Sequence, residues 1–276
     1  MKRTRERADN APIGWVRLRL TVAYDGTDYL GWQLQPKGIS VQEKLEEALS
    51  RLFPSHPRVM SSSRTDTGVH ARGMSVHFDI PAKSWRMDGA KLLLATNAHL
   101  PPDIRVVKAA RTRPDFHARF DAVGKQYRYT LWNNPAHDPR GMRQQWHVPK
   151  PLDVTAMRRA AALLIGSHDF IAFSATPGYE RQHTVRRLTR CDIRRSGPLI
   201  TVVIEADGFL YKMCRGIVGT LVQVGQGRFP SDSLLSMLNS RDRCLAGMTA
   251  PANGLVLWAV FYRKLGTPRR PHPADQ

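Results

Sequence analysis

The sequence predicts an α+β fold built from two ferredoxin-like halves, each with the order βαββαβ. The halves are expected to merge into one mostly antiparallel sheet with a basic cleft between them. Apolar residues alternate with polar ones in two series of segments, which predicts strands, and apolar residues at helical spacing lie between them. With 276 residues and 42% hydrophobic content, the chain is long enough and apolar enough for two small cores.

The N-terminal half is predicted to span residues 15–115. Apolar side chains alternate from Val16 to Val22, as in a half-buried strand. Ser40 and Glu43 form a capping box ahead of an amphipathic helix that begins at Val41. The remaining elements are predicted as a short strand near 57–63, a strand over 74–80, a helix near 87–97 and a strand near 104–109.

The C-terminal half, residues 116–263, repeats this order. Gln126–Trp132 is predicted to be a strand rich in aromatic residues, and Asp153 caps a helix that Gly166 ends. The later elements are predicted as strands near 185–195 and 199–206, helices near 213–224 and 231–239, and a strand over 255–262. The two ends, 1–14 and 264–276, are rich in Arg and Pro and are predicted to be flexible tails.

The charge of the chain points to a polyanionic partner. Lys and Arg number 42 against 23 Asp and Glu, which gives a formal charge of +19. Such an imbalance causes self-repulsion that a nucleic acid would relieve. The alternative is a soluble enzyme that happens to be basic.

Cysteine usage and apolar runs indicate the cytoplasm. Cys191, Cys214 and Cys244 show no CxxC spacing, which argues against a zinc site or a disulfide framework. The first ten residues are charged and do not resemble a secretory signal. The longest apolar run, Leu255–Tyr262, is too short to cross a bilayer, so no membrane association is expected.

Asp66 is the first candidate catalytic residue. It lies in a Thr-Asp-Thr-Gly turn, with Arg64 two residues before it and Gly68 two residues after it. An aspartate there can simply bond its own backbone. Alternatively, Arg64 keeps the carboxylate ionised, and a carboxylate can act as a covalent catalyst toward a sugar carbon or an electron-poor ring. His70 and His77 match no zinc spacing, so no metal is predicted.

Tyr127 and Tyr129 share one face of their predicted strand, since residues i and i+2 lie on the same side. They either belong to the core or form a platform on which an unstacked base can lie, a contact worth ~1–3 kcal/mol. Positive residues that could bind phosphate surround this strand: Arg111, Arg113, Arg119, Lys125 and Arg128.

Arg215 lies among apolar residues where a strand leads into a helix. A guanidinium in such surroundings needs an anion, and Asp66 of the other half is the obvious partner. The alternative is a local role in helix capping or at the surface.

Several motifs resemble the tRNA pseudouridine synthase A family. Arg64-Thr65-Asp66-x-Gly68-Val69-His70-Ala71 looks like its signature, and the resemblance extends over about residues 16–262. Further similar blocks, in the expected order, are Ala23–Gly26, Gly31–Gln33, Ser40–Leu45, Asn97–Pro101, Phe116–Phe120, Lys125–Tyr129 and Phe209–Gly219.

The resemblance implies an enzyme that isomerises uridine to pseudouridine in the tRNA anticodon stem-loop, at nucleotides 38 to 40, without a cofactor. It implies Asp66 as nucleophile, Tyr127 stacking on the target base and Arg215 as the partner of Asp66. Arg64 and Arg119 are expected to bind phosphate or support the site. The resemblance also implies a homodimer. Rival hypotheses are a catalytically silent RNA-binding module and, with less support because the acidic residues do not cluster, a metal-dependent nuclease.

Overall fold

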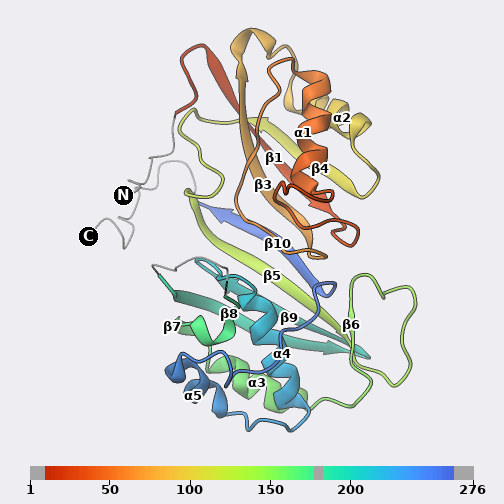
Figure 1. The fold of residues 1–276 in the computed structure, drawn as a ribbon, viewed down its shortest axis with the longest axis vertical. Coiled ribbons are helices and arrows are strands. Elements are labelled where there is room, and N and C mark those ends of the chain that lie inside the picture. The colour runs from red at the N-terminus through yellow and green to blue at the C-terminus, as the bar shows by residue number, and fades with distance from the viewer. Residues whose placement is uncertain (1–9, 177–182, 264–276) are drawn as a thin grey trace.

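The structure, a computed structural model, describes residues 10–176 and 183–263 (Figure 1). The predicted flexible tails therefore lie outside the described residues, except for residues 10–14. The N-terminal elements are β1 (Trp15–Tyr24), α1 (Val41–Leu52), β2 (Met60–Ser61), β3 (His70–Pro81), α2 (Gly89–His99) and β4 (Ile104–Arg111). The sequence prediction for this half is thus confirmed in type and order.

The C-terminal elements follow the second predicted series. They are β5 (Ala122–Trp132), β6 (Trp146–His147), α3 (Val154–Ala162), β7 (Gly166–Asp169), β8 (Val185–Ser196), β9 (Leu199–Ala206), α4 (Met213–Gly225), α5 (Ser233–Ser240) and β10 (Leu255–Tyr262). The short strands β6 and β7 were not predicted. After α3, tighter turns run as far as Ile165, and Gly166, with φ of 115°, begins β7.

All strands belong to one sheet with the order β4-β1-β3-β10-β5-β9-β8-β7, in which β2 pairs with β3 and β6 with β5. In the first half β4 lies beside β1, and β1 beside β3. In the second half β10 lies beside β5, and β5 beside β9, so that without the short β6 and β7 both halves follow the strand order of a ferredoxin-like unit. The halves join where β10 pairs in parallel with the start of β3, at Val256↔His70 and Leu257↔Ala71. The predicted fold class is confirmed.

The shortness of β2 makes this junction possible. Its two residues pair with His77 and Val76, far along β3. The edge of β3 at His70 and Ala71 therefore stays available to β10. A longer β2 in the same register would compete for this edge.

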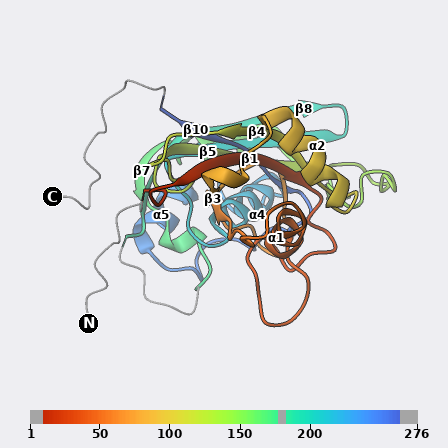
Figure 2. The same cartoon turned by 90° about the horizontal axis from the view of Figure 1, so that it is seen from above.

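The cores lie between the sheet and the helices. Seen from above, α1, α4 and α5 lie on the same side of the sheet (Figure 2). The alternating residues Leu18, Leu20 and Val22 of β1 are fully buried, as are Leu45 and Leu49 of α1. Each such side chain contributes about 1.5–3 kcal/mol when removed from water. The Ser40–Glu43 capping box at the start of α1 is present as predicted.

The corresponding hairpins of the two halves differ in their turns. Residues 62–69 form a long loop between β2 and β3, whereas β8 and β9 are joined by Gly197 and Pro198 alone. Gly197 has φ of 58°, which a tight hairpin turn requires and which glycine adopts without strain. The long loop is the one that carries Asp66.

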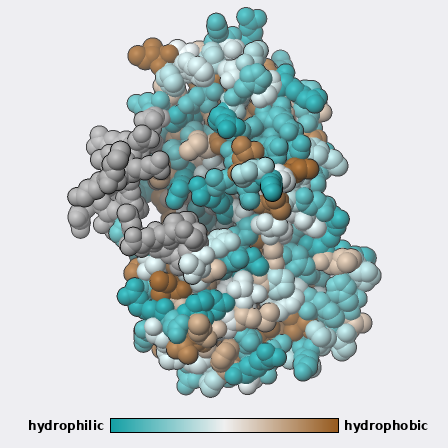
Figure 3. Space-filling view, in the orientation of Figure 1, coloured by the Kyte–Doolittle hydropathy of each residue, from teal (hydrophilic) through white to brown (hydrophobic). Residues whose placement is uncertain are grey.

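Much of the surface seen in Figure 3 is hydrophilic, with hydrophobic residues scattered among the polar ones. Within residues 10–176 and 183–263, no helix combines the length and the apolar character that crossing a membrane requires.

Candidate active site

The loop that carries Asp66 is shaped by glycines and by hydrogen bonds to its backbone. Gly68 has φ of 76°, and the Val69 N–H closes the turn on the Asp66 carbonyl at 3.1 Å. Gly31 also has positive φ, and a Cβ there would lie 2.4 Å from the Thr65 carbonyl oxygen. Neighbouring elements thus hold the loop closely, as expected for a loop that must aim one side chain.

Asp66 and Arg215 form the contact between the halves that the sequence predicted. Arg215 Nη1 lies 3.0 Å from Asp66 Oδ2, and the two side chains are only 15% and 19% exposed. Arg215 Nε donates to the Ala250 carbonyl at 2.7 Å. The guanidinium is therefore held from two directions, with the carboxylate as its charge partner.

Tyr127 lies on β5 in the same region. Its side chain is buried, and its ring meets Phe209 edge-on at 4.9 Å between centroids. Burial raises the pKa of the Tyr127 phenol well above its usual value, and the charge of Asp66 adds to this effect. The phenol therefore stays neutral and lies within electrostatic range of Asp66. Ser63 is buried nearby, and its side-chain interaction with Tyr127 lowers the pKa of the phenol without outweighing burial.

Arg64 and Arg119 lie differently from Arg215. Both are exposed, and neither forms an ion pair with Asp66. The Arg119 guanidinium lies 5.8 Å from the centre of the Phe120 ring. The expectation that Arg64 is the cation beside Asp66 is therefore wrong: its side chain faces solvent, and Arg215 of the other half takes that place.

Lys125 connects β5 to the Asp66 loop, because its Nζ donates to the Ser62 carbonyl at 2.7 Å. Burial, together with the positive charges of Arg119 and Arg186, lowers the pKa of Lys125 to about 8. Lys125 is thus a cation with two positive neighbours beside the candidate site, an arrangement that favours an anionic ligand.

His70, considered above as a metal ligand and as part of the signature motif, contacts two other segments beside the site. It is buried, and its Nδ1 accepts from the Gly26 N–H at 3.0 Å. Its Nε2 lies 3.1 Å from the Asn253 carbonyl oxygen. Asp25 Oδ1 lies 3.1 Å from Nδ1. Burial alone would raise the pKa of Asp25, but hydrogen bonds from Thr27 and the nearby His70 lower it overall.

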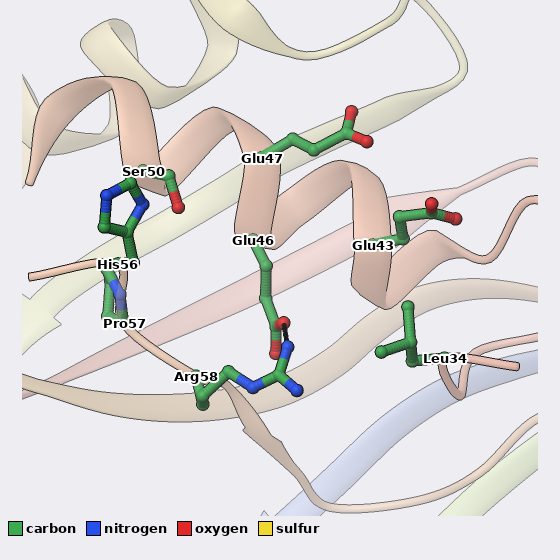
Figure 4. A pocket seen from close by; sticks show the side chains of 8 residues that line it. All are labelled: Leu34, Glu43, Glu46, Glu47, Ser50, His56, Pro57 and Arg58. Atoms are coloured by element: carbon green, nitrogen blue, oxygen red, sulfur yellow. Dashed lines mark hydrogen bonds and ion pairs between the residues drawn. The ribbon is translucent and has the colours of Figure 1, made fainter. Parts of the chain in front are cut away.

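No cluster of metal ligands competes with this site in the residues described, and a pocket elsewhere is acidic. No group of three or more His, Cys, Asp or Glu side chains gathers there in a metal-binding arrangement. A pocket beside α1 is lined by Leu34, Glu43, Glu46, Glu47, Ser50, His56, Pro57 and Arg58 (Figure 4). Its three glutamates would repel a polyanion, and Arg58 is already paired with Glu46 at 2.6 Å.

Comparison with known proteins identifies the family of this chain. A family model described as tRNA pseudouridine synthase matches residues 20–121 and 160–263. A protein named tRNA pseudouridine synthase A from Syntrophotalea carbinolica is 45% identical over 245 residues, 89% of this chain and 96% of that relative. Relatives of the same name from Moorella thermoacetica and Myxococcus xanthus are 44% and 43% identical, covering 89% and 92% of this chain and 99% and 94% of their own lengths. This chain belongs to the tRNA pseudouridine synthase family and is an isomerase.

Proposed function

We propose that the protein isomerises uridine to pseudouridine in the anticodon stem-loop of tRNA, at nucleotides 38 to 40, with Asp66 as nucleophile. The observation that carries this proposal is the ion pair between Asp66 and Arg215, which joins the two halves at a partly buried point. A carboxylate fixed in this way is oriented and partly exposed, as covalent catalysis requires.

The reaction exchanges one bond to the sugar for another. The N1–C1′ glycosidic bond breaks, the uracil rotates, C5 bonds to C1′, the C5 proton leaves to water, and N1 takes up a proton from water. Asp66 either adds to C6 of the ring, attacks C1′, or removes the 2′ proton to assist cleavage. The target base must first leave its stack, which costs a few kcal/mol.

Each neighbour of Asp66 has a proposed role. Arg215 orients the carboxylate through their 3.0 Å contact. Tyr127 stacks on the everted base and, because its phenol stays neutral, adds no negative charge near the nucleophile. Arg64 and Arg119, both exposed, are proposed to contact RNA phosphates. No cofactor takes part in the proposed reaction.

The proposed setting follows from the same arguments. The partner is tRNA, which fits the formal charge of +19 and the basic cleft predicted between the halves. The enzyme is proposed to act in the cytoplasm as a homodimer, with residues 15–115 forming the half with the Asp66 loop and residues 116–263 the half with Tyr127 and Arg215.

The first prediction tests the role of Asp66. With tRNA tritiated at uridine C5, the wild-type protein is expected to release tritium to water, because forming the C5–C1′ bond expels that hydrogen. Asp66→Asn, nearly isosteric, should abolish release and leave tRNA affinity within about threefold, because one carboxylate oxygen is exchanged for an amide nitrogen and the loss of a negative charge does not weaken binding of a polyanion. Asp28→Asn, an exposed aspartate paired with exposed Arg143, is the matched control.

Substantial turnover by Asp66→Asn would rule out the nucleophile role. Binding without release by the wild-type protein would instead indicate a silent RNA-binding module. Shortened RNA, with loss of activity on adding a chelator, would indicate a nuclease.

A further inference from the structure

The segment Ala250–Asn253, which leads from α5 to β10, is held at the junction of the halves by three side chains. The Ala250 carbonyl accepts from Arg215 Nε at 2.7 Å, and the Pro251 carbonyl accepts from the Tyr129 hydroxyl at 2.8 Å. The Asn253 carbonyl oxygen lies 3.1 Å from His70 Nε2. We call this segment the carbonyl strap.

The role of Nδ1 determines that His70 Nε2 is the donor in the contact with the Asn253 carbonyl. Nδ1 accepts the Gly26 N–H, so the neutral ring carries its proton on Nε2 and donates to the Asn253 carbonyl. If the ring gains a second proton, Nδ1–H faces Asp25 Oδ1 at 3.1 Å and Nε2 still donates. The bond from His70 to the strap is therefore present in both protonation states.

These contacts form a chain that begins at Asp66 and returns to the same segment at His70. Asp66 contacts Arg215, and Arg215 contacts Ala250 at one end of the strap. At the other end Asn253 contacts His70, which lies four residues after Asp66 at the start of β3. The strap thus links the guanidinium of Arg215 to the start of β3, next to the loop that carries Asp66.

We infer that His70 is a positioning residue, which fixes the strap through the Asn253 carbonyl and so sets the orientation of Arg215 against Asp66. This inference rests on the proposed function of that pair. It also accounts for the burial of an imidazole that touches neither of the two groups. An error of 1 Å in such a site can cost about 100-fold in rate.

The strap has a second anchor that does not involve His70. Asn253 Nδ2 donates to the carbonyls of Met142 and Gln145, both at 2.9 Å. The Ala250 N–H in turn donates to the Arg215 carbonyl at 3.0 Å, so Ala250 is held through both of its backbone polar groups. A shift of Asn253 is therefore transmitted over a short, well-bonded stretch to the guanidinium.

Two substitutions of His70 separate positioning from simple burial. His70→Gln places an amide nitrogen near the position of Nε2 and retains the donor to Asn253. His70→Asn places a polar atom near Nδ1, so it retains an acceptor for Gly26 and loses the donor to the strap. In the tritium-release assay, kcat is expected to fall about 10- to 100-fold for His70→Asn and to stay within about threefold of wild type for His70→Gln. KM and tRNA affinity should stay nearly constant in both.

Two further variants complete the test. Asn253→Ala removes the second anchor without altering His70 and is expected to lower kcat as well, with KM unchanged; it serves even if His70→Asn does not fold. His56→Asn is the matched control, since His56 is exposed and asparagine tolerates its positive φ of 45°.

A wild-type protein that releases no tritium would refute the proposed function itself. Wild-type release together with full kcat in Asn253→Ala, or equal losses in the two folded His70 variants, would overturn the inference.

Discussion

At the scale of single residues, the site depends on a carboxylate that is neither buried nor free. Asp66 is 19% exposed, so a substrate can reach it, while one oxygen stays 3.0 Å from Arg215 Nη1. Arg215 combines this contact with a bond from Nε to a backbone carbonyl. A guanidinium can hold two acceptors in fixed directions, which an ammonium group does less well.

Arg215→Lys should therefore lower kcat for tritium release by about 100-fold, a loss typical of removing one preorganised charged group. Charge is conserved, so tRNA affinity should change by less than about threefold. Single-turnover kinetics with saturating enzyme measure the chemical step directly. Nearly normal single-turnover rates would mean that the direction of the Arg215 contact is unimportant.

Asp66, Tyr127 and Arg215 could be selected from the sequence because their chemistry is unusual for their surroundings: a carboxylate in a basic chain, stacked-ring candidates on one strand face and a guanidinium among apolar residues. The strap could not be selected in this way. Its Ala250 and Asn253 contacts use backbone carbonyl oxygens, which every residue possesses. Likewise, the exposure of Arg64 depends on how the loop turns, which residue spacing does not determine.

At the scale of elements, the segment between β4 and β5 packs over the first half of the sheet through histidines. The Ala118 N–H donates to His77 Nδ1 at 3.2 Å, and the His77 and His117 rings meet at 4.8 Å. Burial, followed by the charges of His117 and Arg17, lowers the pKa of His77 to about 3. In the unfolded chain this histidine would titrate near 6.5.

This difference predicts a specific sensitivity to acid. Between about pH 6.5 and 3, His77 is protonated in the unfolded chain but stays neutral in the folded protein. The free energy of unfolding therefore decreases as the pH falls. From pH 7 to pH 5, His77 should lower the free energy of unfolding by about 2 kcal/mol. In His77→Asn, which keeps an acceptor for Ala118, urea unfolding at the two pH values should show a drop smaller by that amount. An equal drop in both proteins would contradict the burial argument.

Element positions were largely predictable because alternation and capping are local signals, as at β1 and α1. The strands β6 and β7 were missed because they have two and four residues and form through pairing with longer strands. The parallel pairing of β10 with β3 depends on how far β2 extends, and hydrophobic periodicity carries no information on that.

At the scale of the whole molecule, the excess of positive charge should dominate RNA affinity. The logarithm of the binding constant is expected to fall with the logarithm of salt concentration by about 0.7–0.9 for each phosphate neutralised. Arg119→Gln, which removes an exposed cation near Lys125, should make the slope shallower by about one such contact. Arg58→Gln, which alters a guanidinium already paired with Glu46, is the control. Fluorescence titrations at about 50 to 300 mM salt measure the slopes of both variants. An unchanged slope for Arg119→Gln would exclude a contact between Arg119 and a phosphate.

The contrast between the two hairpin turns explains why a duplicated architecture need not give duplicated chemistry. The turn formed by Gly197 and Pro198 has only two residues and carries no acid, whereas its counterpart in the first half spans residues 62–69. The second unit contributes a ring and a guanidinium to the same place instead. Two similar modules have thus become complementary, and severing the chain between them would leave each fragment with an incomplete set of reactive groups.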